Sequence, residues 1–249
     1  MKIHTLFSPL NADELYFTGR TTVVIDVLRA TSTIDTALSN GAKEIIPVDS
    51  VEFAMKISGN AFGGQTLIGG ERNTKKIDGF HLGNSPLDYS VEKVSGKSII
   101  LFTTNGSKAI VRAKFSENLH TCSFLNLSAM AEYLYNLGNE VTILCAGFNG
   151  MFCLEDTICA GKLITEIEKF KENIELTDAS KASISLSKSF GRGIKKMLSE
   201  TQHGKLLIEN GFEDDIEACS QSNSSSSIPF YRSGVIKLPK ENPEVKTGL

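Results

Sequence analysis

The chain has 249 residues, 41% of them hydrophobic, which is enough for a substantial core in one large α/β domain or two small lobes. A net charge of −3 and a pI near 5.9 argue against proteins that bind nucleic acids or polyanionic surfaces through an overall positive charge. The N-terminal residues show no secretion signal, and no segment approaches a membrane span in length. We therefore expect a cytoplasmic protein with neither nucleic acid nor membrane as its partner.

Five cysteines stand at positions 122, 145, 153, 159 and 219, an odd number without CxxC spacing. This pattern argues against both a disulfide framework and a zinc site. We interpret them as buried free thiols, because free cysteine is among the most buried residue types.

Strand and helix patterns alternate along the first two thirds of the chain. TTVVIDV predicts a strand and ATSTIDTALSNG a helix, and the short run TLIG predicts a further strand. The same pairing recurs in KEIIPVD with SVEFAMKIS, GKSIILF with TTNGSKAIVRAKF, LHTCSF with LNLSAMAEYLYNLG, and NEVTILCAG with LEDTICAGKLITEIEKF. Most of these strands are apolar without alternation, as in strands buried on both faces. The sequence predicts a three-layer α/β/α fold with a largely parallel or mixed sheet.

From about residue 178 the pattern changes to helices, in DASKASISLSKSF, RGIKKMLSETQHGKLLIENG and FEDDIEACSQ. The serine-rich SNSSSS is expected to form a surface loop, and SSIPFYRSGVIKLP a final strand or hairpin. Residues 239–249 are expected to form a frayed tail. We predict a single domain over 1–249 with a helical C-terminal part, and a second lobe from about 178 is the alternative.

Four polar clusters follow predicted strands, over residues 26–33, 69–72, 103–108 and 145–156. In open α/β sheets, ligands bind beyond the C-terminal ends of the strands. We therefore expect the four clusters to converge on one site.

Asp26 and Arg29 distinguish the first cluster. A carboxylate at a strand end can bind a hard cation, and an arginine can clamp a phosphate or carboxylate through two hydrogen bonds. The helix that follows, with Thr31 and Ser32 in its first turn, favours an anion. The alternative is that Asp26 only caps this helix while Thr31 and Ser32 satisfy backbone amides.

The second cluster places Glu71 and Arg72 at the start of a loop, 72–90, rich in glycine, asparagine and proline. Long loops in compact domains are often functional. Lys75 and Lys76, within this loop, belong either to the site or to a solvated edge.

In the third cluster, Asn105, Gly106 and Ser107 offer an amide, a flexible backbone and a hydroxyl to phosphate oxygens, although Asn-Gly also forms ordinary turns. The fourth cluster places Gly147 before Glu155 and Asp156 at a helix start. Carboxylates in a first turn either complement the helix dipole or serve as metal ligands or acid/base groups.

Residue spacing excludes several phosphotransfer chemistries. A cysteine phosphatase requires C-x₅-R, but Met151 stands where the arginine after Cys145 should be. A haloacid-dehalogenase-type enzyme requires DxD, but Leu28 occupies the position of the second aspartate. QHG, around His203, is similar to the RHG of histidine phosphatases but lies late in a helical region and lacks the arginine. The absence of GxGxxG disfavours a dinucleotide oxidoreductase.

Taken together, the motifs resemble the 2-phosphosulfolactate phosphatase family over most of the chain. The motifs that carry the resemblance are VVIDVLRATSTI (23–34), GGER (69–72), GFHLGNSPLDY (79–89), TTNGSKAI (103–110), CAGFNG (145–150), LEDTICAGKLI (154–164), and HGKLL with GFEDDIEAC (203–219).

The resemblance implies a Mg²⁺-dependent phosphatase that hydrolyses (2R)-2-O-phospho-3-sulfolactate to 3-sulfolactate and phosphate in coenzyme M biosynthesis. We predict Asp26, Glu71 and Asp156 as catalytic residues and Mg²⁺ ligands, not all of which need bind the metal directly. The predicted substrate is a small anionic phosphate ester. Its predicted binding residues are Arg29, Thr31, Ser32, Arg72, Asn105, Gly106, Ser107 and Gly147.

Other functions are kept as alternatives. One is a phosphatase for another small anionic hydroxy-acid phosphate, and another is a non-catalytic protein that binds a phospholigand. A phosphoryl transferase acting on a nucleotide has no phosphate-loop signature in its support. A homodimer is a common assembly for a soluble enzyme and is kept beside the monomer.

Overall fold

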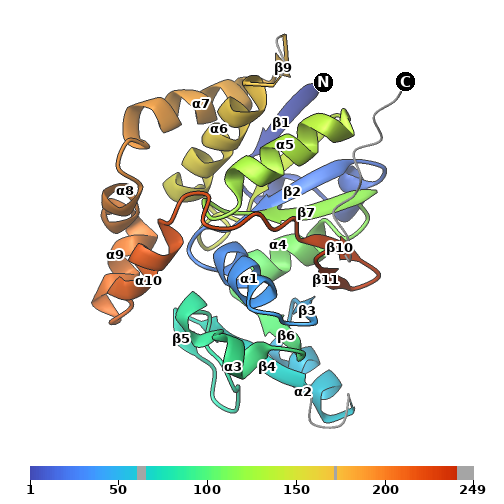
Figure 1. Ribbon diagram of the computed structural model, residues 1–249, viewed down its shortest axis with the longest axis vertical. Coiled ribbons are helices and arrows are strands. Elements are labelled where there is room, and N and C mark those ends of the chain that lie inside the picture. Colours follow the sequence, from blue (N-terminus) through green and yellow to red (C-terminus); the bar gives the residue numbers. More distant parts are fainter. Residues whose placement is uncertain (61–65, 171–172, 240–249) are drawn as a thin grey trace.

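The computed structural model describes residues 1–60, 66–170 and 173–239, so the predicted frayed tail lies outside it apart from Pro239. The described strands form one sheet in the order β5-β4-β6-β3-β11-β10-β7-β2-β8-β1-β9 (Figure 1). They are β1 (Lys2–Leu6), β2 (Thr21–Ile25), β3 (Glu44–Val48), β4 (Thr66–Arg72), β5 (Lys75–Lys76), β6 (Ser98–Phe102), β7 (Asn118–Cys122), β8 (Val141–Cys145), β9 (Glu175–Leu176), β10 (Phe230–Arg232) and β11 (Val235–Lys237).

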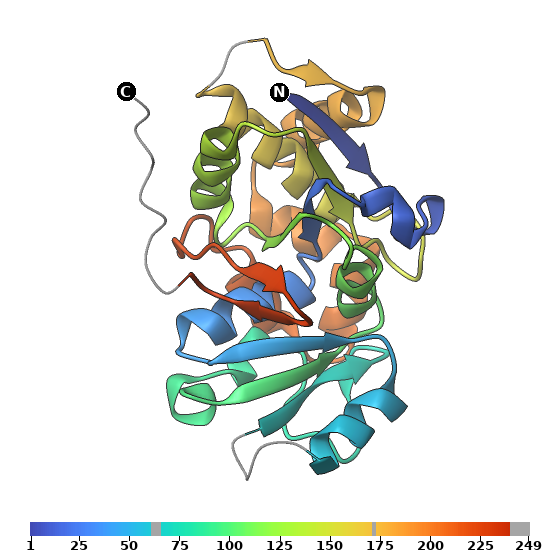
Figure 2. The same ribbon diagram turned by 90° about the vertical axis from the view of Figure 1, so that its right-hand side faces the viewer.

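The sheet consists of two parallel halves joined by an antiparallel hairpin. Strands β4, β6 and β3 are parallel to one another, as are β7, β2, β8 and β1. The hairpin β10–β11 pairs antiparallel with β7 on one side and with β3 on the other. Figure 2 shows this hairpin, in red, between the two halves. The predicted final hairpin is thus confirmed, and it gives the sheet its mixed character.

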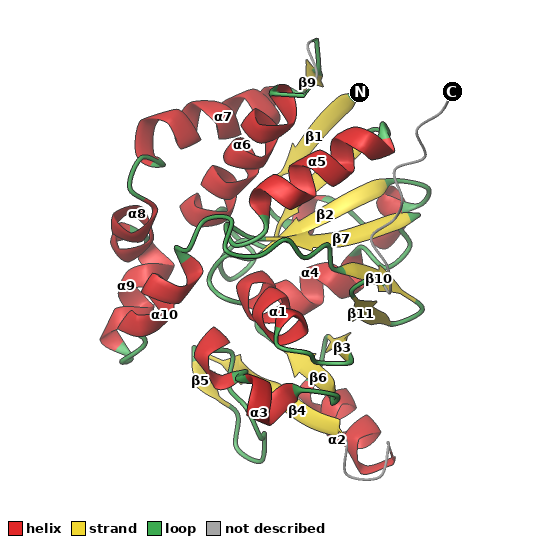
Figure 3. Cartoon of the chain, viewed as in Figure 1, coloured by secondary structure: helices red, strands yellow, loops and turns green. Residues whose placement is uncertain are grey.

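Helices cover both faces of the sheet (Figure 3). Three 3-10 turns, at Pro9–Asn11, Glu14–Phe17 and Pro86–Asp88, complete the described elements. The α-helices are α1 (Ala30–Ser39), α2 (Val51–Asn60), α3 (Val91–Val94), α4 (Gly106–Arg112), α5 (Leu127–Leu137), α6 (Leu154–Glu168), α7 (Asp178–Phe190), α8 (Ile194–Glu200), α9 (Gln202–Glu209) and α10 (Glu213–Cys219).

Alternation along β2 explains the three layers. Val23 and Ile25 point into a cluster with apolar residues of α5 and α6, whereas Val24 points to the opposite face, where α1 and α4 pack. All five residues of β2 are buried. A strand covered on both faces is mostly apolar, so the apolar runs predict this α/β fold correctly.

The helical C-terminal part packs against the first part of the chain. Helix α7 lies along α6 and β1, and Ser180 of α7 donates a hydrogen bond to the carbonyl of Ile3 at 2.9 Å. Apolar residues of α7 to α10 belong to the same core cluster as Val23 and Ile25. The lobe boundary at about 178 stays a prediction.

One predicted helix, RGIKKMLSETQHGKLLIENG, is divided in the structure. Thr201 ends α8 and caps α9, and its hydroxyl accepts a hydrogen bond from the Gly204 amide at 3.0 Å. A Cβ on Gly204 would lie 1.7 Å from the carbonyl oxygen of Leu198, so the close approach of the two helices requires glycine there. This turn directs α9 toward the carboxyl ends of the strands.

All five cysteines are buried and none forms a disulfide, which confirms the interpretation as free thiols. Among the helices in the described ranges, none is long and apolar enough to cross a membrane. The serine-rich stretch forms a loop, where Ser225 and Ser227 donate hydrogen bonds to Asp35 of α1.

Asp35 makes the stability of the fold depend on pH. Burial raises its pKa from 3.8 to about 6, although both serines oppose the shift. Because the folded state binds the proton more tightly, the free energy of unfolding falls as pH rises from about 4 to 6. Asp35→Asn keeps an acceptor for both serines, so the variant should gain up to about 3 kcal/mol over the wild type at pH 7 but little near pH 4.

Urea unfolding of the wild type and Asp35→Asn across this pH range measures the difference. Asp78→Asn, at an exposed position, is the control and should follow the wild type at every pH. A constant difference between wild type and Asp35→Asn would contradict the assignment.

Candidate active site

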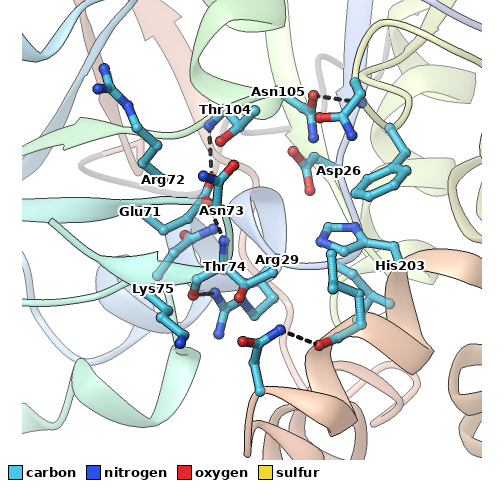
Figure 4. Close-up of a pocket in the computed structure, with 16 residues that line it drawn as sticks. Asp26, Arg29, Glu71, Arg72, Asn73, Thr74, Lys75, Thr104, Asn105 and His203 are labelled. Carbon is cyan, nitrogen blue, oxygen red and sulfur yellow. Dashed lines mark hydrogen bonds between the residues drawn. The ribbon is translucent and has the colours of Figure 1, made fainter.

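A cavity of about 600 Å³ opens where the carboxyl ends of β2, β4, β6 and β8 meet (Figure 4). Residues after all four strands line it, including Asp26, Glu71, Thr104 and Phe148, and α9 contributes His203. The predicted convergence of the polar clusters is therefore visible in the structure, although not every predicted site residue reaches the cavity.

Asp26 directly follows β2 and lines the cavity, with only 5% of its surface exposed. Its Oδ1 atom accepts a hydrogen bond from the Ala30 amide at 3.2 Å, whereas Oδ2 accepts none from the described residues. Burial raises its pKa to about 6; His203 and the Ala30 amide oppose this shift, and Glu71 adds to it. Asp26 thus has one oxygen fixed and one available to a ligand.

Gly106, at the start of α4, is placed against this carboxylate. A Cβ there would lie 2.4 Å from Oδ2 of Asp26 and 2.5 Å from Cβ of Ala30. Glycine is therefore needed at 106 so that α4 can approach Asp26. The neighbouring Asn105 lines the cavity, and its side-chain oxygen accepts a hydrogen bond from the Asn149 amide at 3.1 Å.

Glu71 lies at the end of β4 on the opposite wall, and 7% of its surface is exposed. One carboxylate oxygen accepts the Thr104 amide at 2.7 Å, and the other accepts the Thr74 amide at 2.9 Å. Each oxygen retains a second lone pair for a cation or a water molecule. Glu71 therefore fixes the start of the loop after β4 and still offers lone pairs to a cation in the cavity.

Arg29 lines the cavity but is also tied to the C-terminal part of the chain. Its guanidinium donates to Asp215 of α10 at 2.5 Å and to the carbonyl of Thr74 at 2.6 Å, and it lies 4.4 Å from the ring centroid of Phe212. Asp215 in turn accepts a hydrogen bond from Ser85 at 2.5 Å. Arg29 is thus held rigidly, with some of its five N–H groups left for an anion.

Arg72 and Lys75 lie at the outer part of the cavity, and both are exposed. Figure 4 shows their side chains on the same side as Glu71, across the cavity from His203. They add two exposed cations to a wall that also holds Glu71 and Arg29, the latter paired with Asp215. An acidic protein therefore has a local site that attracts an anion.

Three predicted phosphate ligands are directed at the backbone instead. The hydroxyl of Thr31 donates to the Asp26 carbonyl and accepts from its amide, and that of Ser32 donates to the Val27 carbonyl at 2.9 Å. The Ser107 hydroxyl accepts the Thr103 amide at 2.8 Å. All three residues are buried and absent from the cavity wall, as the alternative interpretation of Thr31 and Ser32 describes. Their contact with substrate stays a prediction.

Asp156 connects two strand ends. Its carboxylate oxygens accept the amide of Val27 at 2.9 Å, after β2, and that of Gly147 at 3.1 Å, after β8. Burial raises the pKa of Asp156 well above its ordinary value, and the charges of Asp26 and Glu155 add to the shift. Neither Asp156 nor Gly147 lines the cavity, so this geometry favours a structural role for both. Their predicted catalytic, metal-binding and substrate-binding roles stay predictions.

One further residue of the site, His203, is not among the predicted site residues, and it lies near Glu155, for which the sequence left a metal or acid/base role open. His203 of α9 lines the cavity, and its ring lies on Phe148 with centroids 4.6 Å apart. Its Nδ1 atom lies 3.7 Å from Oε1 of Glu155, which is 2% exposed. In the sequence, only the similarity of QHG to a histidine-phosphatase motif pointed to His203. No sequence pattern predicted the turn at Thr201 that brings α9 to the cavity.

The cavity offers only a few carboxylates to a metal ion among the residues that the structure describes. Among residues 1–60, 66–170 and 173–239, no group of three or more His, Cys, Asp or Glu side chains is arranged to hold a metal ion. Mg²⁺, however, is commonly held by one or two carboxylates, with water and substrate phosphate completing its shell. Asp26 and Glu71, which share the cavity, fit that pattern.

Comparison with known proteins agrees with the resemblance. The family model described as 2-phosphosulpholactate phosphatase matches residues 8–234. A protein of Clostridium perfringens strain SM101 named probable 2-phosphosulfolactate phosphatase is 40% identical over 99% of this chain and all of its own length. Proteins of the same name from Thermotoga petrophila and Thermotoga maritima are 46% and 45% identical over 90% of this chain and 94% of their own. The chain therefore belongs to the 2-phosphosulfolactate phosphatase family.

Proposed function

We propose that this protein is a Mg²⁺-dependent phosphatase that hydrolyses (2R)-2-O-phospho-3-sulfolactate to 3-sulfolactate and phosphate, a step of coenzyme M biosynthesis, in the cytoplasm. The observation that carries the chemistry is Asp26. It is a buried carboxylate on the wall of a cavity that Arg72 and Lys75 also line, and its Oδ2 atom accepts no hydrogen bond from the described residues. A site that only bound an anion would gain nothing from a carboxylate there, because like charges repel.

The residues of the cavity divide the work of phosphoryl transfer, in which positioning and electrostatics dominate. Asp26 and Glu71 would hold Mg²⁺, which when bound polarises the phosphoryl group as a Lewis acid. Arg29, fixed by Asp215, presents its remaining N–H groups to anionic oxygens. Asn105, whose side-chain oxygen accepts the Asn149 amide, can offer its side-chain N–H groups to the phosphoryl oxygens.

The wall formed by Arg29, Arg72 and Lys75 supports a substrate with several negative groups. 2-Phosphosulfolactate carries a phosphate, a carboxylate and a sulfonate on three neighbouring carbons. A carboxylate or sulfonate beside the phosphate would give Arg72 and Lys75, the exposed cations of the wall, an anionic partner. The charge of the wall therefore favours a multiply anionic hydroxy-acid phosphate over a simple phosphate ester.

The proposal is tested by phosphate release from 2-phosphosulfolactate and from 2-phospholactate, which lacks the sulfonate. We expect Mg²⁺-dependent turnover of both, with the higher kcat/KM for the sulfonate. Equal kcat/KM values for the two esters would support phosphatase activity but contradict a preference for the sulfonate. No release from either ester, together with a thermal shift on adding 2-phosphosulfolactate, would instead identify a binding protein.

The two-residue strand β5 provides a matched pair of variants for this assay. Lys75 lines the cavity and Lys76 does not, although both are exposed and adjacent. Lys75→Gln should lower kcat/KM for the sulfonate more than for 2-phospholactate, whereas Lys76→Gln should change neither. Identical behaviour of the two variants would reject a role for Lys75 in substrate choice.

A further inference from the structure

His203 and Glu155 form a pair that the proposed chemistry has not yet used. Glu155, in the first turn of α6, is 2% exposed, and its Oε1 atom accepts no hydrogen bond from the part of the chain that the structure describes. Nδ1 of His203 lies 3.7 Å from that oxygen. An unpaired buried carboxylate oxygen is costly, and a hydrogen atom on Nδ1 of the imidazole would compensate it.

The imidazole ring also packs against an aromatic side chain. Its ring packs on Phe148 with an interplanar angle of 31° and a centroid distance of 4.6 Å. Phe148 and His203 both line the cavity, and Figure 4 shows the imidazole on the same side as Asp26. With Nδ1 directed at Glu155 and the ring fixed on Phe148, the other ring nitrogen, Nε2, is the one left for a ligand in the cavity.

Hydrolysis of an alkyl phosphate needs a proton donor. The leaving alcohol is a strong base as an alkoxide, so protonating its oxygen while the P–O bond breaks lowers the barrier. Both oxygens of Glu71 already accept backbone amides, and Asp26 is assigned to the metal. Histidine is the side chain that most often serves as a general acid, and His203 lines the cavity.

We propose that His203 is a catalytic residue that protonates the ester oxygen of the leaving alcohol, and that Glu155 is a positioning residue that orients its imidazole. Water attacks phosphorus, and the electron pair of the breaking P–O bond passes to the ester oxygen. That oxygen takes the proton from Nε2 and leaves as the alcohol. Phosphate leaves carrying the protons of the attacking water, returns one to solvent, and His203 regains its proton from solvent.

The inference rests on the proposed phosphatase function, and the dependence on the leaving group tests it separately. His203→Gln should lower kcat for 2-phosphosulfolactate by about 10²- to 10⁴-fold. With p-nitrophenyl phosphate, whose leaving group needs no proton, the loss should be far smaller. His81→Gln is the control, because His81 lies in an exposed loop, where Nδ1 accepts the Ile68 amide.

Equal losses on both esters would overturn the proton-donor role. An inactive wild type on both esters would overturn the phosphatase function and this inference together, so the two failures are distinguishable. Glu155→Gln should show the same preference for the aryl ester with a smaller loss and an unchanged KM. If that variant unfolds, as circular dichroism would reveal, Glu155→Asp replaces it; a loss independent of the leaving group would reject the positioning role.

Discussion

Replacing Asp26 with asparagine is expected to lower Mg²⁺-dependent phosphate release by a factor on the order of 10³. The amide is the same size and its oxygen can still accept the Ala30 amide, so the end of β2 should keep its shape. What is lost is the negative charge at Oδ2, where a cation or the attacking water would be held. Steady-state kinetics at saturating Mg²⁺, with circular dichroism to confirm folding, measure the effect.

Asp49 offers a matched control for Asp26. It follows β3 as Asp26 follows β2, but it is exposed and does not line the cavity. Asp49→Asn should therefore retain wild-type turnover. If Asp26→Asn kept near wild-type activity, the central assignment of the site would be wrong, whatever the other variants showed.

The second large effect is expected at Asp215, and it concerns stability as well as activity. Asp215→Ala removes the charge partner of Arg29, which is only 2% exposed. Breaking one member of a buried ion pair typically costs about 3 to 5 kcal/mol, because the other charge remains buried without compensation. Loss of the Ser85 hydrogen bond adds to this cost. We expect a lower urea midpoint and weaker substrate binding.

Asp214→Ala provides the comparison on the same helix. Asp214 is exposed, so its removal should change the free energy of unfolding by less than about 0.5 kcal/mol. Asp215→Asn, which can still accept from Ser85, should fall between the two variants. Equal stability of Asp215→Ala and Asp214→Ala would contradict the view that α10 holds Arg29 in place.

The sequence predicts the part of the fold that depends on local patterns. The apolar runs of β2, β3, β6 and β8 stand out because strands buried on both faces are mostly apolar. Strand β1 is harder to detect, since its burial alternates and KIHTL contains polar residues. The placement of β10–β11 between β3 and β7 depends on pairing across more than 100 residues, which no local pattern encodes.

The site divides in the same way. Asp26, Glu71 and Asn105 reach the cavity because each lies at or just after the end of a strand, and the carboxyl ends of parallel strands meet at one edge. The hydroxyls of Thr31 and Ser107 look as suitable for a phosphate in the sequence as Asn105 does, but the start of a helix leaves backbone groups that need hydrogen-bond partners. In the structure both hydroxyls bond to backbone groups just before their helices. His203 arrives from a helix whose direction is set by tertiary packing, so spacing alone could not place it.

The most direct test of the central claim is phosphate release by the wild-type protein from 2-phosphosulfolactate, measured before and after removal of metal with EDTA and again after Mg²⁺ is restored. We predict turnover that EDTA abolishes and Mg²⁺ recovers. Turnover unaffected by EDTA would contradict the metal assignment of Asp26 and Glu71, and absence of turnover under every condition would contradict the proposed function itself.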